Sequence, residues 1–162
     1  MSLIIIDGYN LIGIQHGDLQ KERSALIDRL AAYRKAKGHD ITLVFDGWKS
    51  GGQKDMTEGI AGIRVIYSRL GDRADLVIKR MISGDKKDWI VITSDRDIMA
   101  HAWASGSVPV RSEVFERCLH SAEGSGGGDD AASEEDEEPA HKGSAHTLSR
   151  KDKALQRVLR KL

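Results

Sequence analysis

The sequence predicts an α/β fold, a three-layer α/β/α sandwich with a largely parallel sheet of about five strands. Two observations carry this prediction. Short apolar runs alternate with segments of helical periodicity over residues 1–120, as expected when helices connect parallel strands. Three of the apolar runs are also followed by a carboxylate, and the carboxyl ends of parallel strands are where α/β sheets bind ligands.

The expected strands are rich in Ile and Val and are mostly bounded by Asp, Gly or Ser. They cover residues 3–6, 41–45, 63–67, 89–93 and 108–110. Residues 46–60 contain four glycines and are expected to form a mobile loop. Crossovers between the parallel strands should be right-handed.

Apolar residues at helical spacing predict the connecting helices. These helices cover residues 19–37, 72–82, 96–104 and 112–119. In the first of them Leu26, Ile27, Leu30 and Tyr33 share one face, and Gly38 marks the end. Such an apolar face is what a helix needs in order to pack on a sheet.

The chain of 162 residues is expected to form one domain with an appendage. Residues 1–120 form the domain, residues 121–145 a disordered linker of Gly, Ser, Asp and Glu, and residues 146–162 a basic amphipathic helical tail. The net charge of zero conceals this division. Residues 123–138 carry 8 acidic and no basic side chains, whereas residues 141–162 carry 7 basic side chains and one acidic.

The tail has two open interpretations. Leu155, Val158, Leu159 and Leu162 are spaced as one face of a helix that basic residues flank. The tail could be freely tethered and bind RNA or the ribosome, or it could dock on the domain through its apolar face. The acidic linker could fold back on the tail and compete with nucleic acid.

The residue content excludes several classes of site. Cys118 is the only cysteine, so a disulfide within the chain and a cysteine-based zinc site are excluded, and the six histidines lack metal-binding spacing. No apolar run approaches membrane-spanning length, and residues 1–6 do not resemble a secretory leader. The protein is therefore expected to be cytoplasmic.

Acidic residues gather where the expected strands end. Asp7, Asp46 and Asp95 follow the expected strands at residues 3–6, 41–45 and 89–93. Asp75 lies in the helix that follows the strand at residues 63–67. Carboxylates that converge at one edge repel each other unless a cation lies between them. Oxygen ligands without His or Cys favour Mg²⁺ or Mn²⁺, and such an ion can activate a water to attack a phosphodiester. The acids therefore predict a metal-dependent phosphoryl site.

These acids also have structural alternatives. Asp75 and Asp97 both lie three residues after an Asp or Ser, at the spacing of a helix capping box. Asp46 precedes a glycine and could simply begin a turn. Asp7 and Asp95 are harder to explain structurally, because both place a charge at the end of an apolar strand. We favour Asp7, Asp75 and Asp95 as the acid core, with Asp46 and Asp97 as secondary metal ligands.

Five short motifs share their order and spacing with a known family. They are Asp7-Gly-Tyr-Asn10, Val44-Phe-Asp-Gly47, Val65-Ile-Tyr-Ser68, Arg73-Ala-Asp75 and Val91-Ile-Thr-Ser-Asp95. Over residues 1–120 the chain resembles the NYN domain, a PIN-like nuclease domain, and within it the bacterial YacP-like group. The resemblance implies a PIN-like (Rossmann-like) sheet and an endoribonuclease that acts on translated messenger RNA.

The resemblance also implies roles for individual residues. Asp7, Asp75 and Asp95 would be the metal-site acids, and Asn10 would position the substrate or a metal-bound water. The chain departs from the family at Leu76, where a second acid is common. This departure leaves fewer ligands for a second metal.

Basic and aromatic side chains near the acids are candidates for binding RNA. Trp48 and Tyr9 could stack on a splayed base of single-stranded RNA, or Tyr9 could pack beneath the site. The basic candidates could hold phosphates or could form an ordinary solvated rim. They are Lys49, Lys54, Arg64, Arg69 and Arg73.

Two functions remain open. The leading hypothesis is a Mg²⁺- or Mn²⁺-dependent endoribonuclease that hydrolyses RNA through a metal-activated water and acts on messenger RNA at the ribosome. The rival is a non-catalytic RNA- or ribosome-binding module. A phospho-receiver domain is set aside, because it needs two acids after the first strand and a Lys after the fifth, where Arg111 stands.

Overall fold

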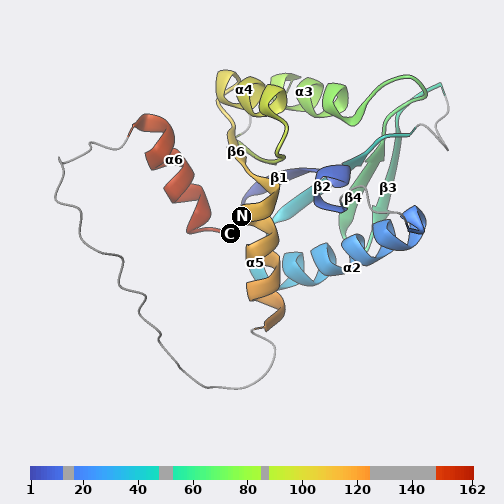
Figure 1. The fold of residues 1–162 in the computed structure, drawn as a ribbon, viewed down its shortest axis with the longest axis horizontal. Helices are drawn as coiled ribbons and strands as arrows, with labels where there is room; N and C mark the ends of the chain where they lie inside the picture. Colours follow the sequence, from blue (N-terminus) through green and yellow to red (C-terminus); the bar gives the residue numbers. More distant parts are fainter. Residues whose placement is uncertain (13–16, 48–52, 85–87, 125–148) are drawn as a thin grey trace.

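The computed structural model describes residues 1–12, 17–47, 53–84, 88–124 and 149–162. Within them a six-stranded sheet lies between layers of helices, so the predicted α/β/α sandwich is confirmed (Figure 1). The strands are β1 (Leu3–Asp7), β2 (Asp40–Phe45), β3 (Met56–Ile60), β4 (Ile63–Tyr67), β5 (Trp89–Ile92) and β6 (Val108–Val110). The helices are α1 (Gly8–Ile12), α2 (Leu19–Lys37), α3 (Ala74–Gly84), α4 (Arg96–Ala104), α5 (Ser112–Gly124) and α6 (Arg150–Leu159).

The strand order places β1 at the centre of the sheet. The order is β3-β4-β2-β1-β5-β6, and every neighbouring pair is parallel except β3 and β4. The chain therefore builds β2 on one side of β1 and later places β5 on the other side. Ligands of open α/β sheets bind beyond the carboxyl ends of the strands at such a reversal of strand order.

The central strand alternates between the two faces of the sheet. Ile4 and Ile6 pack with α2 and α5, whereas Ile5 packs with α3 and α4 on the other face. All three side chains are completely buried, which explains why β1 is continuously apolar. Among the described residues, no helix is long and apolar enough to cross a membrane.

β3 was missed by the sequence prediction, which assigned residues 46–60 to a loop. β3 is an antiparallel edge strand joined to β4 by Ala61 and Gly62, whose φ angles of 51° and 80° are both positive, as a tight hairpin turn requires. Four of its five residues are exposed, so burial does not impose a hydrophobic pattern on it. Residues 48–52 of the predicted loop lie outside the described residues.

The predicted end of α2 is confirmed, whereas that of α5 is wrong. Gly38 ends α2 in a left-handed conformation with a φ of 71°, as its place in the sequence predicts. α5 continues to Gly124, beyond the predicted end at residue 119 and into the predicted linker. There Arg29 of α2 pairs with Glu116 at 2.8 Å and with Glu123 at 2.7 Å, which ties the extended helix to the domain. Residues 125–148, which hold the rest of the predicted linker, lie outside the described residues.

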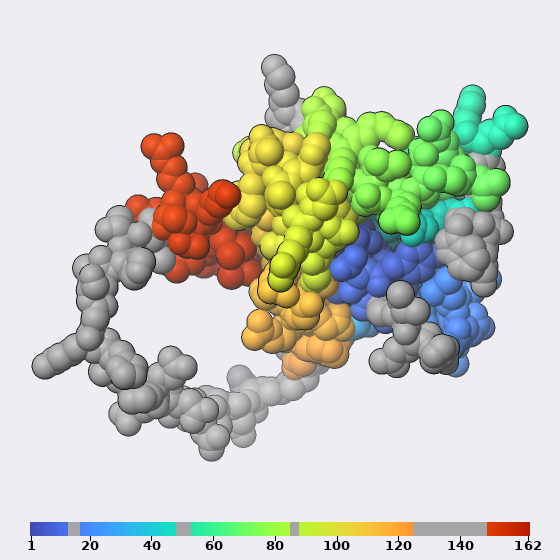
Figure 2. Space-filling view, turned by 45° about the horizontal axis from the view of Figure 1, so that its top comes forward, coloured from blue at the N-terminus to red at the C-terminus, as the bar shows by residue number. Residues whose placement is uncertain are grey.

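The C-terminal helix α6 packs on the domain beside β6 (Figures 1 and 2). Val158 and Leu162 join the apolar core on the α2 and α5 face. The Tyr33 hydroxyl donates to the Leu162 carbonyl at 2.7 Å, and Nε2 of the buried His39 lies 2.9 Å from the Lys161 carbonyl. The structure therefore has the docked tail, and the freely tethered alternative is not what it shows.

Candidate active site

Three carboxylates lie at the carboxyl ends of neighbouring parallel strands. Asp46 follows β2, Asp7 ends β1, and Asp95 ends the turn from β5 into α4 as the N-cap of that helix. Because β2, β1 and β5 are adjacent, these side chains share one edge of the sheet at the reversal of strand order. Asp75 lies in the first turn of α3, the helix that leads from β4 to β5. The topology thus gathers the acids that the sequence singles out.

Asp7 is a buried carboxyl group in an electrostatically unfavourable place. Only 7% of the residue is exposed. Burial raises its pKa from 3.8 to about 6, and the charges of Asp46 and Asp95 act in the same direction, while hydrogen bonds from Asn10 and Thr93 oppose the rise. At neutral pH the anion is therefore poorly compensated by the protein, and a bound cation would stabilise it.

Asn10 holds Asp7 in place and links the two sides of the site. Its Nδ2 donates to Oδ2 of Asp7 at 2.6 Å, and its Oδ1 accepts from the backbone N–H of Ser94 at 3.1 Å. Gly8 allows the chain to turn from β1 directly into α1, because a Cβ at this position would overlap the Phe45 ring. In the Asp-Gly-x-Asn motif, Asp7 is thus the acid, Gly8 allows the close approach to the Phe45 ring, and the Asn10 amide orients the acid.

Thr93 is a second polar support that sequence reasoning missed. Its buried hydroxyl donates to Oδ2 of Asp7 at 3.4 Å and accepts from the backbone N–H of Asp95 at 3.1 Å. It therefore links the carboxylate of Asp7 to the backbone of Asp95. The available signal was a hydroxyl residue at the end of an otherwise apolar strand.

Asp75 has an oxygen without a hydrogen-bond partner among the described residues. The capping of α3, the structural alternative for Asp75, is supplied by Asp46. Oδ1 of Asp46 accepts the backbone N–H of Ala74, the first residue of α3. Oδ1 of Asp75 is buried and has no hydrogen-bond partner among the described residues. A buried oxygen without a partner is costly, and a cation or its water would satisfy it.

The structural alternative for Asp97, a capping role at the start of α4, is wrong, because Asp95 performs that role. Oδ1 of Asp95 accepts the backbone N–H groups of Asp97 at 2.8 Å and Ile98 at 3.3 Å. Asp97 instead points to solvent and pairs with Lys79. The cap begins one residue later than the Ser94 of the expected capping box, which is a shift that sequence spacing does not distinguish.

Replacement of Asp95 by Ala should therefore lower the free energy of unfolding by about 1 kcal/mol, because α4 loses its N-cap. Asp97→Ala removes only an exposed ion pair and should leave the melting temperature nearly unchanged. Asp95→Asn keeps an oxygen that can cap the helix and should restore most of the lost stability. Urea denaturation of the three variants measures these differences, and equal losses in both alanine variants would contradict the assignment.

Lys79 of α3 brings a positive charge to the acid edge. Its bond to Asp97 raises the pKa of Lys79, and the charges of Asp75 and Asp95 act in the same direction. Lys79 is thus close to two of the acids that the site is built on. No sequence pattern indicates this proximity, because the position of Lys79 depends on how α3 packs against α4.

The donors of the site fit a hard divalent cation in kind. They are carboxylate oxygens, one of them on a strongly buried acid and another without a partner. The fit is incomplete in number, because no group of three or more acidic, His or Cys side chains in the described parts of the chain is arranged to hold a metal. Asp7 and Asp75, with Asp95, would need water or phosphate oxygens to complete the coordination, as Mg²⁺ usually does.

The basic residues predicted to surround the site are only partly brought together. Arg64 lies in the amino half of β4, away from the acid edge, and is not part of the mouth. Arg69 pairs with Asp72 at 2.7 Å, so its charge is largely compensated. Arg73 and Lys54 are exposed and stay candidates. Lys49 and Trp48 lie outside the described residues.

Tyr9 packs beneath the site, as one of its two interpretations has it. Its ring contacts Phe45 with centroids 5.3 Å apart, and its hydroxyl donates to the backbone carbonyl of Asp46 at 3.4 Å. The hydroxyl also accepts from the guanidinium of Arg23. The sequence does not predict this role of Arg23, because its aromatic neighbours come from distant segments.

The doubly wound sheet, with acids where its strand order reverses, has the architecture of the class of α/β domains to which PIN-like nucleases belong. The family model of the YacP-like NYN domain matches residues 4–160, and the chain belongs to this family. NYN domains of this kind are a PIN-like nuclease family, so the resemblance over residues 1–120 is confirmed. The match extends past residue 120 to residue 160, so it includes α6.

Two solved structures share the fold. Both are crystal structures of Rae1 (YacP) from Bacillus subtilis. One matches with 22% identity and a TM-score of 0.61, covering 77% of each chain. The other, of the W164L mutant, matches with 20% identity and a TM-score of 0.62, covering 76% of this chain and 77% of that chain. No curated protein matches the sequence.

Proposed function

We propose that this protein is a Mg²⁺- or Mn²⁺-dependent endoribonuclease that hydrolyses RNA phosphodiester bonds at the acid edge. The observation that carries the proposal is the buried Asp7, whose pKa is raised to about 6 at the point where the strand order reverses. The unpartnered oxygen of Asp75 supports it, since both groups call for a cation. Family membership supports the nuclease class.

The residues of the chain have separable roles in this proposal. Asp7, Asp75 and Asp95 would hold the cation, and Asn10 and Thr93 would fix the orientation of Asp7. When bound, such a cation supplies a water that is acidic enough to attack near neutral pH and stabilises negative charge on the phosphate.

Messenger RNA at the ribosome is the proposed substrate, and the exposed side of α6 is the proposed contact with ribosomal RNA. Arg150, Lys153 and Arg157 are exposed on α6, as is Arg160 directly after it, while Val158 faces the domain. A docked helix holds these charges in a fixed position, which favours binding of a polyanion. This function would place the protein in the cytoplasm.

Cleavage of a short single-stranded RNA with a fluorescent label tests the proposal. Mn²⁺ or Mg²⁺ should be required, and Asp75→Asn should reduce the rate by about a hundredfold or more. Asp28→Asn removes an exposed acid of α2 outside the site and is the matched control. Calorimetric titration with Mn²⁺ should show binding that Asp75→Asn weakens. Metal-independent cleavage, or full activity in Asp75→Asn, would refute the assignment.

A non-catalytic RNA- or ribosome-binding module is the second candidate. Leu76, which is 46% exposed, stands beside Asp75 where the family often has another acid. Asp46 and Asp95 each also use one carboxylate oxygen to accept a backbone N–H at the start of a helix, which leaves fewer oxygens for a metal. Such a module would bind RNA equally well with EDTA or Mn²⁺ and would leave the RNA intact.

A further inference from the structure

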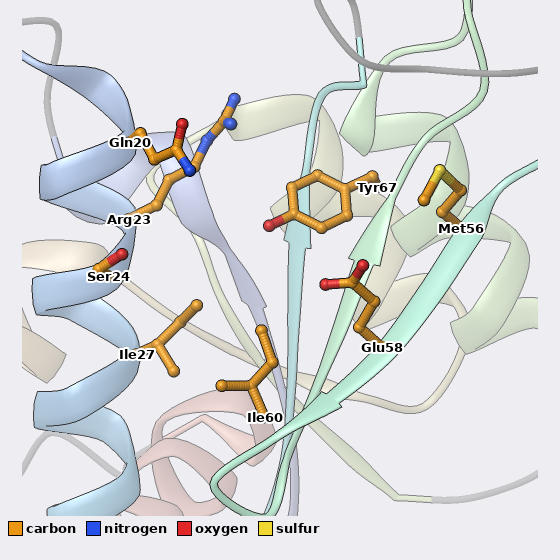
Figure 3. A pocket seen from close by; sticks show the side chains of 8 residues that line it. All are labelled: Gln20, Arg23, Ser24, Ile27, Met56, Glu58, Ile60 and Tyr67. Atoms are coloured by element: carbon orange, nitrogen blue, oxygen red, sulfur yellow. The ribbon is translucent and has the colours of Figure 1, made fainter.

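A cavity of about 330 Å³ lies between the start of α2 and the edge strands β3 and β4. Gln20, Arg23, Glu58 and Tyr67 form its polar walls, and Ile27 and Ile60 are apolar lining residues (Figure 3). Its volume is at the lower end of the range for small-molecule sites, about 300–1,000 Å³. None of these side chains belongs to the acid site described above.

One wall carries a fixed and uncompensated positive charge. The guanidinium carbon of Arg23 lies 5.5 Å from the ring centroid of Tyr9, 5.4 Å from that of Phe45 and 5.7 Å from that of Tyr67. Among the described residues no carboxylate pairs with Arg23, whose guanidinium donates to the Tyr9 hydroxyl instead. Three aromatic rings therefore hold a cation whose charge is available to an anionic ligand.

The opposite wall carries a negative charge. Glu58 projects from β3 toward the cavity, and its carboxylate has no hydrogen bond or ion pair within the part of the chain that the structure describes (Figure 3). Tyr67 lies between the two charges, and its ring stacks on Phe45 with centroids 5.8 Å apart and an angle of 24°. Burial raises the pKa of Tyr67, while the positive charge of Arg23 opposes this rise and the negative charge of Glu58 adds to it.

The cavity is connected to the acid edge through Tyr9. Arg23 donates to the Tyr9 hydroxyl, which in turn donates to the backbone carbonyl of Asp46. Tyr67 and Phe45 are the last residues of β4 and β2, so the cavity opens at the same end of the sheet as the acids. A nucleotide bound here would be joined by a short stretch of RNA backbone to a phosphate at Asp7.

We propose that this cavity is a subsite for a guanine base of the single-stranded RNA substrate, with Glu58 reading its Watson–Crick edge. The inference rests on the proposed ribonuclease function and adds a base preference to it. The ring of Tyr67 would stack on the base, and Arg23 would attract the adjoining phosphate.

Guanine is the base that matches these walls. Its Watson–Crick edge places two neighbouring donors, N1–H and the N2 amino group, where one carboxylate can accept both. Adenine and cytosine offer a single donor beside an acceptor, and uracil places its one donor between two carbonyls that repel a carboxylate. An amide in place of the carboxylate accepts with only one atom, and its NH₂ group would face a donor of guanine.

Equilibrium binding of GMP, AMP, CMP and UMP to the full chain, in EDTA, tests the subsite without cleavage. GMP should bind at least tenfold more tightly than the other three, and Glu58→Gln should remove this preference by weakening GMP binding about tenfold. Glu22→Gln is the matched control, because Glu22 is an exposed carboxylate near the start of α2 that does not line the cavity. It should leave the preference intact, which separates base recognition from a general gain in positive charge.

Equal binding of all four nucleotides, no measurable binding of any, or a GMP preference that survives Glu58→Gln would each overturn the subsite. None of these outcomes touches the nuclease proposal, which depends on metal-dependent cleavage. Conversely, a GMP preference in a protein that cleaves no RNA would keep the subsite and refute the nuclease. Mapping of cleavage products should show that the wild type cuts RNA at a constant distance from a G. Glu58→Gln should cut with less preference for these positions.

Discussion

Asp7→Asn should abolish metal-dependent cleavage of RNA and, without metal, make the folded protein more stable at pH 8. The wild-type carboxylate is buried beside two other acids, and its pKa rises from 3.8 to about 6. A difference of this size corresponds to about 3 kcal/mol of destabilisation when the group is ionised. The amide removes this cost, and its oxygen can still accept from Asn10 and Thr93.

The pH dependence gives this prediction its sign. A carboxyl group whose pKa is higher in the folded state contributes stability that is complete below the unfolded pKa of 3.8 and is lost as the pH rises through about 6. The two proteins should therefore unfold at similar urea concentrations near pH 4, and Asp7→Asn should be the more stable one at pH 7 to 8. Urea titrations across this range at low salt, with EDTA, measure the difference.

Metal provides the second half of the test. Because the cation would bind the ionised carboxylate, Mn²⁺ should raise the melting temperature of the wild type at pH 8 and have little effect on Asp7→Asn. Asp28→Asn, an exposed acid on α2, should behave as the wild type in both respects. A variant that is less stable than the wild type at pH 8 without metal would show that the ionised Asp7 is a structural group, and the catalytic assignment would fail.

The acids and the fold around them were predictable because they follow from burial. The run before Asp7 is completely apolar, and the run before Asp46 is apolar except for the buried Thr42, as expected of strands covered on both faces. The order of strands and helices then brings their ends together. Local signals with the same spacing were ambiguous. Asp95 and Asp97 both satisfy the sequence rule for a helix start, and only the backbone decides that Asp95 is the cap.

Features that depend on packing between distant segments were not predictable in the same way. β3 has four exposed residues, so its pairing with β4 leaves no hydrophobic pattern in the sequence. The rings around Arg23 come from α1, β2 and β4, and no local pattern joins them. The periodicity of the tail shows that it has an apolar face, but the surface that this face covers is set by α2, α5 and β6.

Deletion of residues 149–162 should lower the stability of the domain substantially, because α6 is part of its core. The deletion removes Val158 and Leu162, which are 8% and 6% exposed, and leaves the Tyr33 hydroxyl and the buried His39 without their carbonyl partners. Loss of two buried aliphatic side chains and two hydrogen bonds costs about 4 kcal/mol, or roughly 10 °C in melting temperature. Thermal melts of the full chain and the truncated chain compare the two.

Point variants on the two sides of α6 separate packing from charge. Val158→Ala should cost about 2 kcal/mol, since it leaves a cavity against the domain. Arg157→Ala, one residue earlier on the exposed side, should keep the melting temperature and reduce the salt dependence of RNA binding by about one unit of slope. If the deletion instead left the melting temperature unchanged and only weakened RNA binding, the tail would be a tether. The hydrogen bonds that Tyr33 and His39 make to the last two residues would then contribute nothing to stability in solution.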